Sequence, residues 1–104
     1  MGNTEFIYMA QEIVEEYIKE YYKFKMEASE SSVERELLNE SGVYTVWVCK
    51  TLQNNKALLS TDIPDGMYYE VTYNGDENEF YLDAYKKIHN IIIDENNPSI
   101  LKRW

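Results

Sequence analysis

The chain has 104 residues and a mass of 12.4 kDa, and 19 Asp and Glu against 10 Lys and Arg give a net charge of -9. This length fits a single domain, and an aromatic content of 14% is too high for a disordered tail. Cys49 and His89 are the only residues of their types, which excludes an internal disulfide and disfavours a Cys/His zinc site. The apolar runs are too short for a membrane span and the N-terminus is not a signal peptide, so we expect a soluble protein with no metal and no cofactor.

Residues 5–28 are predicted to form one long amphipathic helix. No Gly or Pro interrupts the segment, and Asn3 or Thr4 can cap its start. At 100° per residue the apolar side chains share one broad face: Phe6, Ile7, Ala10, Ile13, Val14, Tyr17, Ile18, Tyr21, Phe24 and Ala28. A capping box at residues 31–34 then predicts a short second helix over residues 32–40, which ends before Gly42.

After Gly42 the apolar residues alternate with polar ones, which favours β-strands. We expect strands over residues 43–51, 56–61, 67–73 and 79–85, with turns at 53–55, 63–66 and 74–76. Residues 86–93 also fit a helical stripe, but the β-branched run at 91–93 favours a bent or interrupted strand that extends the sheet to residue 93. Residues 96–104 are expected to form a loose tail.

Short connections make successive strands antiparallel neighbours. The expected fold is therefore α+β, with the long helix packed on one face of a four-stranded antiparallel meander, cystatin-like or roll-like in outline, in a single domain of residues 1–104. If Tyr69 and Tyr73 face the helix, then Tyr68, Tyr81 and Tyr85 face outward.

The sequence contains no motif that supports an enzyme. His89 has no Ser or Cys at a recognisable spacing and is expected to be structural, and Cys49 is expected to be a small buried hydrophobe. The loop at 74–85 begins like a calcium loop, but Glu79 stands where such a loop needs Gly, so the loop is interpreted as a solvated hairpin tip. A weak cation site remains an alternative if four acidic residues gather at one end of the sheet: Asp62, Asp65, Asp76 and Glu77.

The polar face of the predicted helix is the first candidate binding surface. Glu12, Glu16 and Glu20 follow one another at i, i+4 steps beside Glu15, a spacing at which like charges weaken a helix. The simplest interpretation is a solvated face, and the functional one is a docking surface for a basic protein groove. The charge of -9 and the lack of a basic stripe argue against nucleic acid and anionic membranes as partners.

The outward tyrosines of the sheet are the second candidate surface. Tyr is favoured at protein interfaces because it is large, stiff and half polar. The alternative interpretation is that Tyr simply suits strands. The residues concerned are Tyr68, Tyr81 and Tyr85.

Three stretches after Gly42 resemble small proteins of unknown function from phages and prophages of Gram-positive bacteria. They are residues 43–61 (VYTVWVCKTLQNNKALLST), residues 64–76 (PDGMYYEVTYNGD) and residues 81–87 (YLDAYKK). The resemblance supplies no activity and no catalytic residue. It implies a phage accessory protein in the cytoplasm of a bacterial host, and proteins of this size, charge and origin include inhibitors of host defence such as anti-CRISPR proteins.

The leading hypothesis is a non-enzymatic phage protein of anti-CRISPR type that occludes a basic nucleic-acid-binding surface of a host protein, such as a CRISPR effector nuclease. The alternatives are a phage replication or assembly adaptor that binds through the tyrosines, and a domain that binds a small ligand on the sheet. The candidate contacts of the leading hypothesis are Glu12, Glu15, Glu16 and Glu20, followed by Asp62, Asp65, Asp76 and Glu77.

Overall fold

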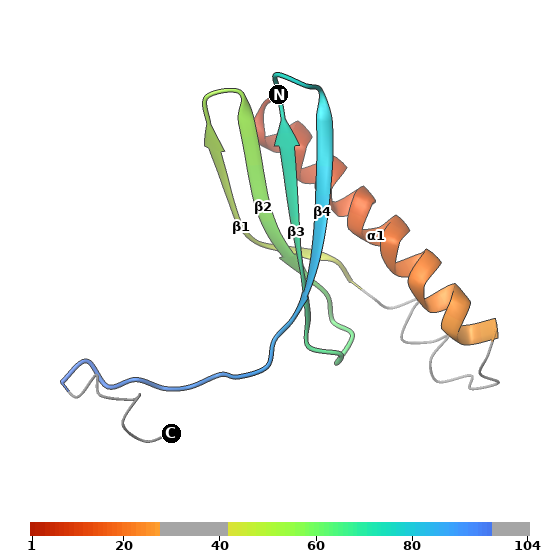
Figure 1. The fold of residues 1–104 in the computed structure, drawn as a ribbon, viewed down its shortest axis with the longest axis vertical. Coiled ribbons are helices and arrows are strands. Elements are labelled where there is room, and N and C mark those ends of the chain that lie inside the picture. Colours follow the sequence, from red (N-terminus) through yellow and green to blue (C-terminus); the bar gives the residue numbers. More distant parts are fainter. Residues whose placement is uncertain (28–41, 97–104) are drawn as a thin grey trace.

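The computed structural model describes residues 1–27 and 42–96. In these residues one helix, α1 (Asn3–Glu27), is followed by four strands, β1 (Tyr44–Thr51), β2 (Asn54–Ser60), β3 (Met67–Asn74) and β4 (Glu79–Lys86) (Figure 1). The predicted α+β fold is therefore confirmed. The predicted short helix at 32–40 and all of the predicted tail except Asn96 lie outside the described residues. In the described part of the chain no helix is long and apolar enough to cross a membrane.

Helix α1 starts two residues before the predicted position. The amide of Phe6 donates to the Gly2 carbonyl over 3.0 Å, so Gly2 is the capping residue and the prediction of Asn3 or Thr4 was wrong. The Asn3 side chain instead accepts a hydrogen bond of 3.2 Å from Nδ2 of Asn55, a fully buried residue of β2. This contact fastens the start of α1 to the middle of the sheet.

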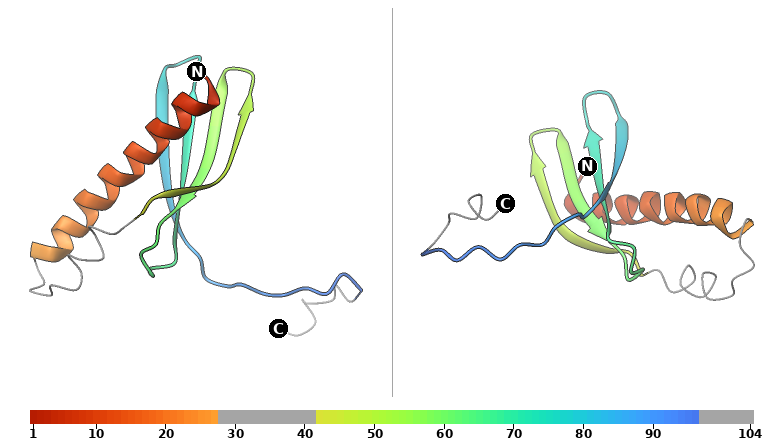
Figure 2. Two further views of the ribbon diagram at one scale, coloured as in Figure 1. Left: turned by 180° about the vertical axis from the view of Figure 1, so that it is seen from behind. Right: turned by 60° about the horizontal axis from the view of Figure 1, so that its bottom comes forward.

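The apolar face of α1 packs on one face of the sheet. Phe6, Ala10, Val14 and Ile18 are fully buried at successive i, i+4 positions, as the periodicity predicted. Tyr21 was predicted to face the core, but 43% of it is exposed. The second half of α1 runs past the strands rather than across them, so the last turns have less sheet to cover (Figures 1 and 2).

The sheet is an antiparallel meander in the order β1-β2-β3-β4. The first hairpin turns at residues 52–53, one residue earlier than predicted, with Leu52 at a φ of 55°. Strands β2, β3 and β4 pair without a register shift, whereas β1 has a bulge between Thr45 and Trp47. The core forms between α1 and the inner two strands, where Ala57, Leu59, Tyr69 and Val71 are buried.

The other face of the sheet is not covered by α1, and we call it the open face. Because directly paired residues share a face, the registers place alternating residues of all four strands there, and we define the open face by eleven of them. They are Trp47, Cys49 and Thr51 of β1, Lys56 and Leu58 of β2, Tyr68, Glu70 and Thr72 of β3, and Tyr81, Asp83 and Tyr85 of β4.

The sheet ends at Lys86 and does not continue to residue 93, so this part of the prediction was wrong. The amide of Lys87 donates to the Gly66 carbonyl over 2.8 Å, and the chain then leaves the sheet. Residues 87–93, which we call the arm, extend away from both α1 and the strands (Figures 1 and 2). The β-branched residues of the arm favour a strand, but no strand of the described chain pairs with them.

Candidate functional site

The open face carries an aromatic surface at its two edges. Tyr81 and Tyr85 of β4 and Trp47 of β1 are each about half exposed. Tyr68 is half-buried beside Tyr85, its direct partner across β3 and β4, and the ammonium of Lys87 lies 6.0 Å from the centre of the Tyr68 ring. The structure thus places all three sequence-predicted tyrosines on the face away from α1.

Polar side chains occupy the middle of the open face. Lys56 and Glu70 form an ion pair of 2.9 Å across β2 and β3, and this hydrogen bond raises the pKa of the Lys56 ammonium. Asp83 lies directly opposite Glu70, so Lys56 also offsets a repulsion between two carboxylates. The Tyr81 hydroxyl donates to Oε2 of Glu79 over 2.6 Å, and this bond raises the pKa of Tyr81.

Cys49 belongs to the open face and is exposed, so the prediction of a buried cysteine was wrong. The strand is rich in β-branched residues on both faces, but only the face that carries Val48 packs against the core. Cys49 lines a shallow hollow of about 270 Å³ together with Thr51, Lys56 and Thr72.

Sequence reasoning did not select Trp47 and Leu58 as site residues. They are direct partners across β1 and β2 and extend the apolar part of the open face toward β1. The period of two from Trp47 to Thr51 was readable in the sequence. The bulge between Thr45 and Trp47 could not be predicted from the sequence. This bulge changes which of the preceding residues share a face with Trp47.

The four helix carboxylates predicted to bind a partner lie on the side of α1 that faces away from the sheet. All four are exposed, and none forms an ion pair with another described residue. Exposed Lys19 and Lys23 lie on the same helix face, so the surface is mixed rather than purely acidic. The residues are Glu12, Glu15, Glu16 and Glu20.

The four acidic residues of the loops do not gather at one end of the sheet. Asp62 and Asp65 lie in the β2–β3 loop, and Asp76 and Glu77 lie in the β3–β4 turn. These connections flank opposite ends of β3, whose eight residues span about 23 Å. Within the described ranges no group of three or more His, Cys, Asp or Glu residues is placed to hold a metal. The weak cation site is therefore wrong.

Asp65 has a structural role in the fold. Its Oδ2 accepts a hydrogen bond of 2.5 Å from the Tyr22 hydroxyl, and its Oδ1 accepts one of 3.0 Å from the Met67 amide. Burial and the contact with Asp65 raise the pKa of Tyr22 well above its usual value. Asp65 thereby joins the β2–β3 loop to the second half of α1.

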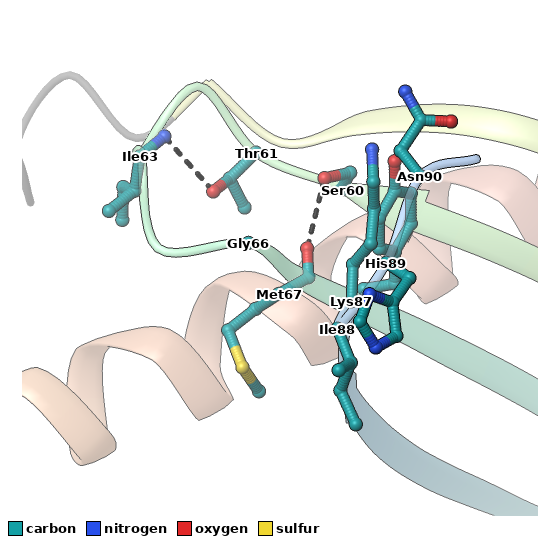
Figure 3. Close-up of a pocket in the computed structure, with 10 residues that line it drawn as sticks. Ser60, Thr61, Ile63, Gly66, Met67, Lys87, Ile88, His89 and Asn90 are labelled. Atoms are coloured by element: carbon teal, nitrogen blue, oxygen red, sulfur yellow. Dashed lines mark hydrogen bonds between the residues drawn. The ribbon is translucent and has the colours of Figure 1, made fainter. Parts of the chain in front are cut away.

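A second hollow, of about 400 Å³, lies where the arm leaves the sheet (Figure 3). Its serine and threonine hydroxyls already have partners: Ser60 donates to the Met67 carbonyl over 3.1 Å, and Thr61 accepts the Ile63 amide over 3.2 Å. Lys87 and His89 line the other side, and His89, which was expected to be structural, is exposed. Cys49 and His89, the two residues suited to nucleophile and base chemistry, line different hollows.

Comparisons with known proteins identify a family and no function. The model of a family of unknown function, DUF6275, matches residues 7–95. No curated protein and no solved structure matches the chain. The match spans α1 and the whole sheet. The chain therefore belongs to the family of unknown function DUF6275.

Proposed function

We propose that this chain is a non-enzymatic protein-binding module that holds its partner on the open face of the sheet. The observation that carries this proposal is that α1 covers only one face of the sheet, while the open face displays Trp47, Tyr81 and Tyr85, each about half exposed. Tyr and Trp are enriched at protein interfaces relative to the rest of the surface, so three such exposed residues on one face favour a protein partner.

The polar groups of the open face also favour a protein partner. Lys56 and Glu70 already satisfy each other, so a partner that covers them buries no lone charge. A polyanion gains little here because Lys56 is the only cation among the eleven open-face residues and the chain carries a charge of -9. Catalysis is less favoured, since Cys49 and His89 line different hollows.

The test replaces three exposed aromatic residues of the open face: Trp47→Ser, Tyr81→Ser and Tyr85→Ser. The control replaces two exposed apolar residues elsewhere, Tyr8→Ser on α1 and Leu52→Ser in the β1–β2 turn. A photo-crosslinking residue at position 85 first identifies the partner in an extract of the bacterial host, and the same residue at position 8 gives the background. The purified partner is then titrated with each variant.

We expect the open-face variant to lose at least tenfold in affinity, about 1.4 kcal/mol, while the control binds like the wild type. Binding should change little with salt because the contact is mainly apolar. Equal affinities of the two variants would contradict the proposal. Circular dichroism of each variant confirms that the fold is intact.

The outer face of α1 supports a second candidate function, inhibition of a host defence protein with a basic surface. Its four glutamates are exposed and none pairs with another described residue, so their field acts outward. The proposed origin is a phage or prophage, and the proposed site of action is the bacterial cytoplasm. In this case the acidic face would occupy a nucleic-acid channel, as anti-CRISPR proteins do.

This second candidate predicts the opposite salt dependence. Replacement of Glu12, Glu15, Glu16 and Glu20 by Gln should lower affinity at least tenfold, mostly through slower association, and raised salt should weaken the wild type. The control neutralises exposed carboxylates outside the candidate contacts, with Glu5→Gln, Asp94→Asn and Glu95→Gln. A loss confined to the helix variant supports the second candidate, and a loss confined to the open-face variant supports the first.

A further inference from the structure

The arm exposes a run of large apolar side chains. Ile88 is 83% and Ile92 is 92% exposed, and Ile91 and Ile93 are about half exposed. β-Branched apolar residues are among the best strand formers and are uncommon in solvated linkers. The arm therefore has the composition of a strand without a pairing strand in the described chain.

Strand β4, from which the arm departs, is an edge of the sheet, and no strand within residues 1–27 and 42–96 pairs with its outer side. It pairs with β3 residue for residue, from Met67 opposite Lys86 to Asn74 opposite Glu79, with no shift. Edges are commonly protected by bulges, Pro or a covering element. The other edge, β1, has such a bulge before Trp47, whereas β4 has neither bulge nor Pro. Its regular outer side is thus the edge that can accept another strand.

We propose that a second copy of this chain docks at the β4 edge, and that the arm of each copy adds as an antiparallel strand to β4 of the other. The exchange is reciprocal, so the same two elements are used on both copies and the assembly closes as a dimer. This inference goes beyond the proposed function because it uses the arm and the edge rather than the open face.

The charge pattern of β4 and the arm favours self-pairing in one register. With Lys87 opposite Asp83 of the second copy, Ile88 lies opposite Leu82 and Ile91 opposite Glu79 of that copy. Residues 87–91 then pair with β4, and Ile92 and Ile93 lie beyond its first residue. Opposite charges directly across a strand pair stabilise it, whereas like charges destabilise it. A chain of net charge -9 repels its copies in general, so a complementary register is needed for two copies to pair.

A second copy is favoured over an unrelated partner because one chain supplies both halves of the contact. An exposed regular edge and an exposed β-branched segment are each prone to uncontrolled pairing. Reciprocal exchange occupies both at once and leaves neither free.

The test measures the oligomeric state by sedimentation equilibrium over a range of concentrations. We expect a dimer of twice 12.4 kDa that dissociates on dilution. The variant Ile88→Asp with Ile91→Asp should raise the dissociation constant at least tenfold, because both residues lie opposite β4 of the second copy. The control Leu52→Asp with Tyr8→Asp also adds two acidic residues at exposed apolar positions and should dimerise like the wild type. Asn90→Pro, which removes a backbone donor from the arm without removing an isoleucine, should also weaken the dimer.

A charge exchange tests the register itself. Asp83→Lys and Lys87→Asp should each weaken the dimer, and the two together should restore it. A wild type that stays monomeric at every concentration overturns the proposal, as does a dimer that the arm variants leave unchanged. Trp47→Ser on β1 separates this inference from the proposed function, because it should weaken partner binding without changing the mass of the assembly.

Discussion

The hydrogen bond between Tyr22 and Asp65 can be tested as the link that holds the second half of α1 to the sheet. The Tyr22 hydroxyl donates to the Asp65 carboxylate over 2.5 Å, and both residues are half-buried. A hydrogen bond to a charged group contributes about 1.5–3 kcal/mol. Since water reaches both side chains, we expect the lower end, about 1.5 kcal/mol.

The perturbations are Tyr22→Phe and Asp65→Asn, alone and together. Tyr22→Phe should lower the free energy of unfolding by about 1.5 kcal/mol, which corresponds to about 6–12 °C in Tm for a domain of this size. Asp65→Asn should cost slightly more, because the bond that Oδ1 accepts from the Met67 amide also loses its charge. The double variant should cost less than the sum of the two, since each single change already removes the shared bond.

Urea unfolding followed by circular dichroism provides the four free energies of this double-mutant cycle. The control is Asp62→Asn, a neighbouring but exposed carboxylate, which should change stability by less than about 0.5 kcal/mol. If the two changes add to within about 0.3 kcal/mol, the two side chains do not interact and the structural role of Asp65 is refuted. Asp65 would then return to the set of exposed carboxylates available to a partner.

Three further outcomes follow from the structure. A Cβ on Gly75 would lie 2.1 Å from the Gln53 carbonyl oxygen, so Gly75→Ala should destabilise the fold by about 1–3 kcal/mol. Gly2→Ala, with nothing within 4 Å, should cost only the preference for Gly over Ala at a helix N-cap, less than about 1 kcal/mol, in the same thermal melts. Burial raises the pKa of Tyr69 to about 12, and burial with the Asp65 contact raises that of Tyr22 as well. The unfolded chain therefore loses these protons first, so the contribution of the two tyrosines to stability should be constant below about pH 10 and fall from there through pH 12, less steeply in Tyr69→Phe. Because Cys49 is exposed, its thiol should be alkylated rapidly in the folded protein, and Cys49→Ser should change stability by less than about 0.5 kcal/mol.

The alternation of residues predicted the sheet faces correctly, but it could not show which faces are covered. Tyr69 and Val71 point to the core and Tyr68 and Glu70 away from it, as their period of two requires. Cys49 was wrongly predicted to be buried because its strand has β-branched residues on both faces. Such a sequence does not show whether one face of the strand is buried or both. A single described helix packs on one face only, and that fact depends on the tertiary arrangement.

Two other errors, the weak cation site and the extension of the sheet to residue 93, have different causes. The opposite positions of Asp62 and Asp76 could have been derived from the sequence, because consecutive hairpin connections of a meander lie at opposite ends of the shared strand. The departure of residues 87–93 from the sheet could not be derived from the sequence. β-Propensity is local, whereas a strand also needs a neighbour to pair with, and residues 87–93 continue from β4 past Met67, the first residue of β3.

The distribution of charge decides which surfaces can take part in association. A second copy that approaches the outer face of α1 meets exposed glutamates, and this repulsion acts over about 8 Å at physiological salt. The β4 edge instead carries two lysines, Lys86 and Lys87, together with Asp83, and the open face pairs Lys56 with Glu70. Electrostatic repulsion is therefore lowest at the surfaces where apolar side chains are exposed. A net charge of -9 thus does not prevent this chain from associating, because it disfavours contacts through α1 and leaves those through the sheet and the arm available.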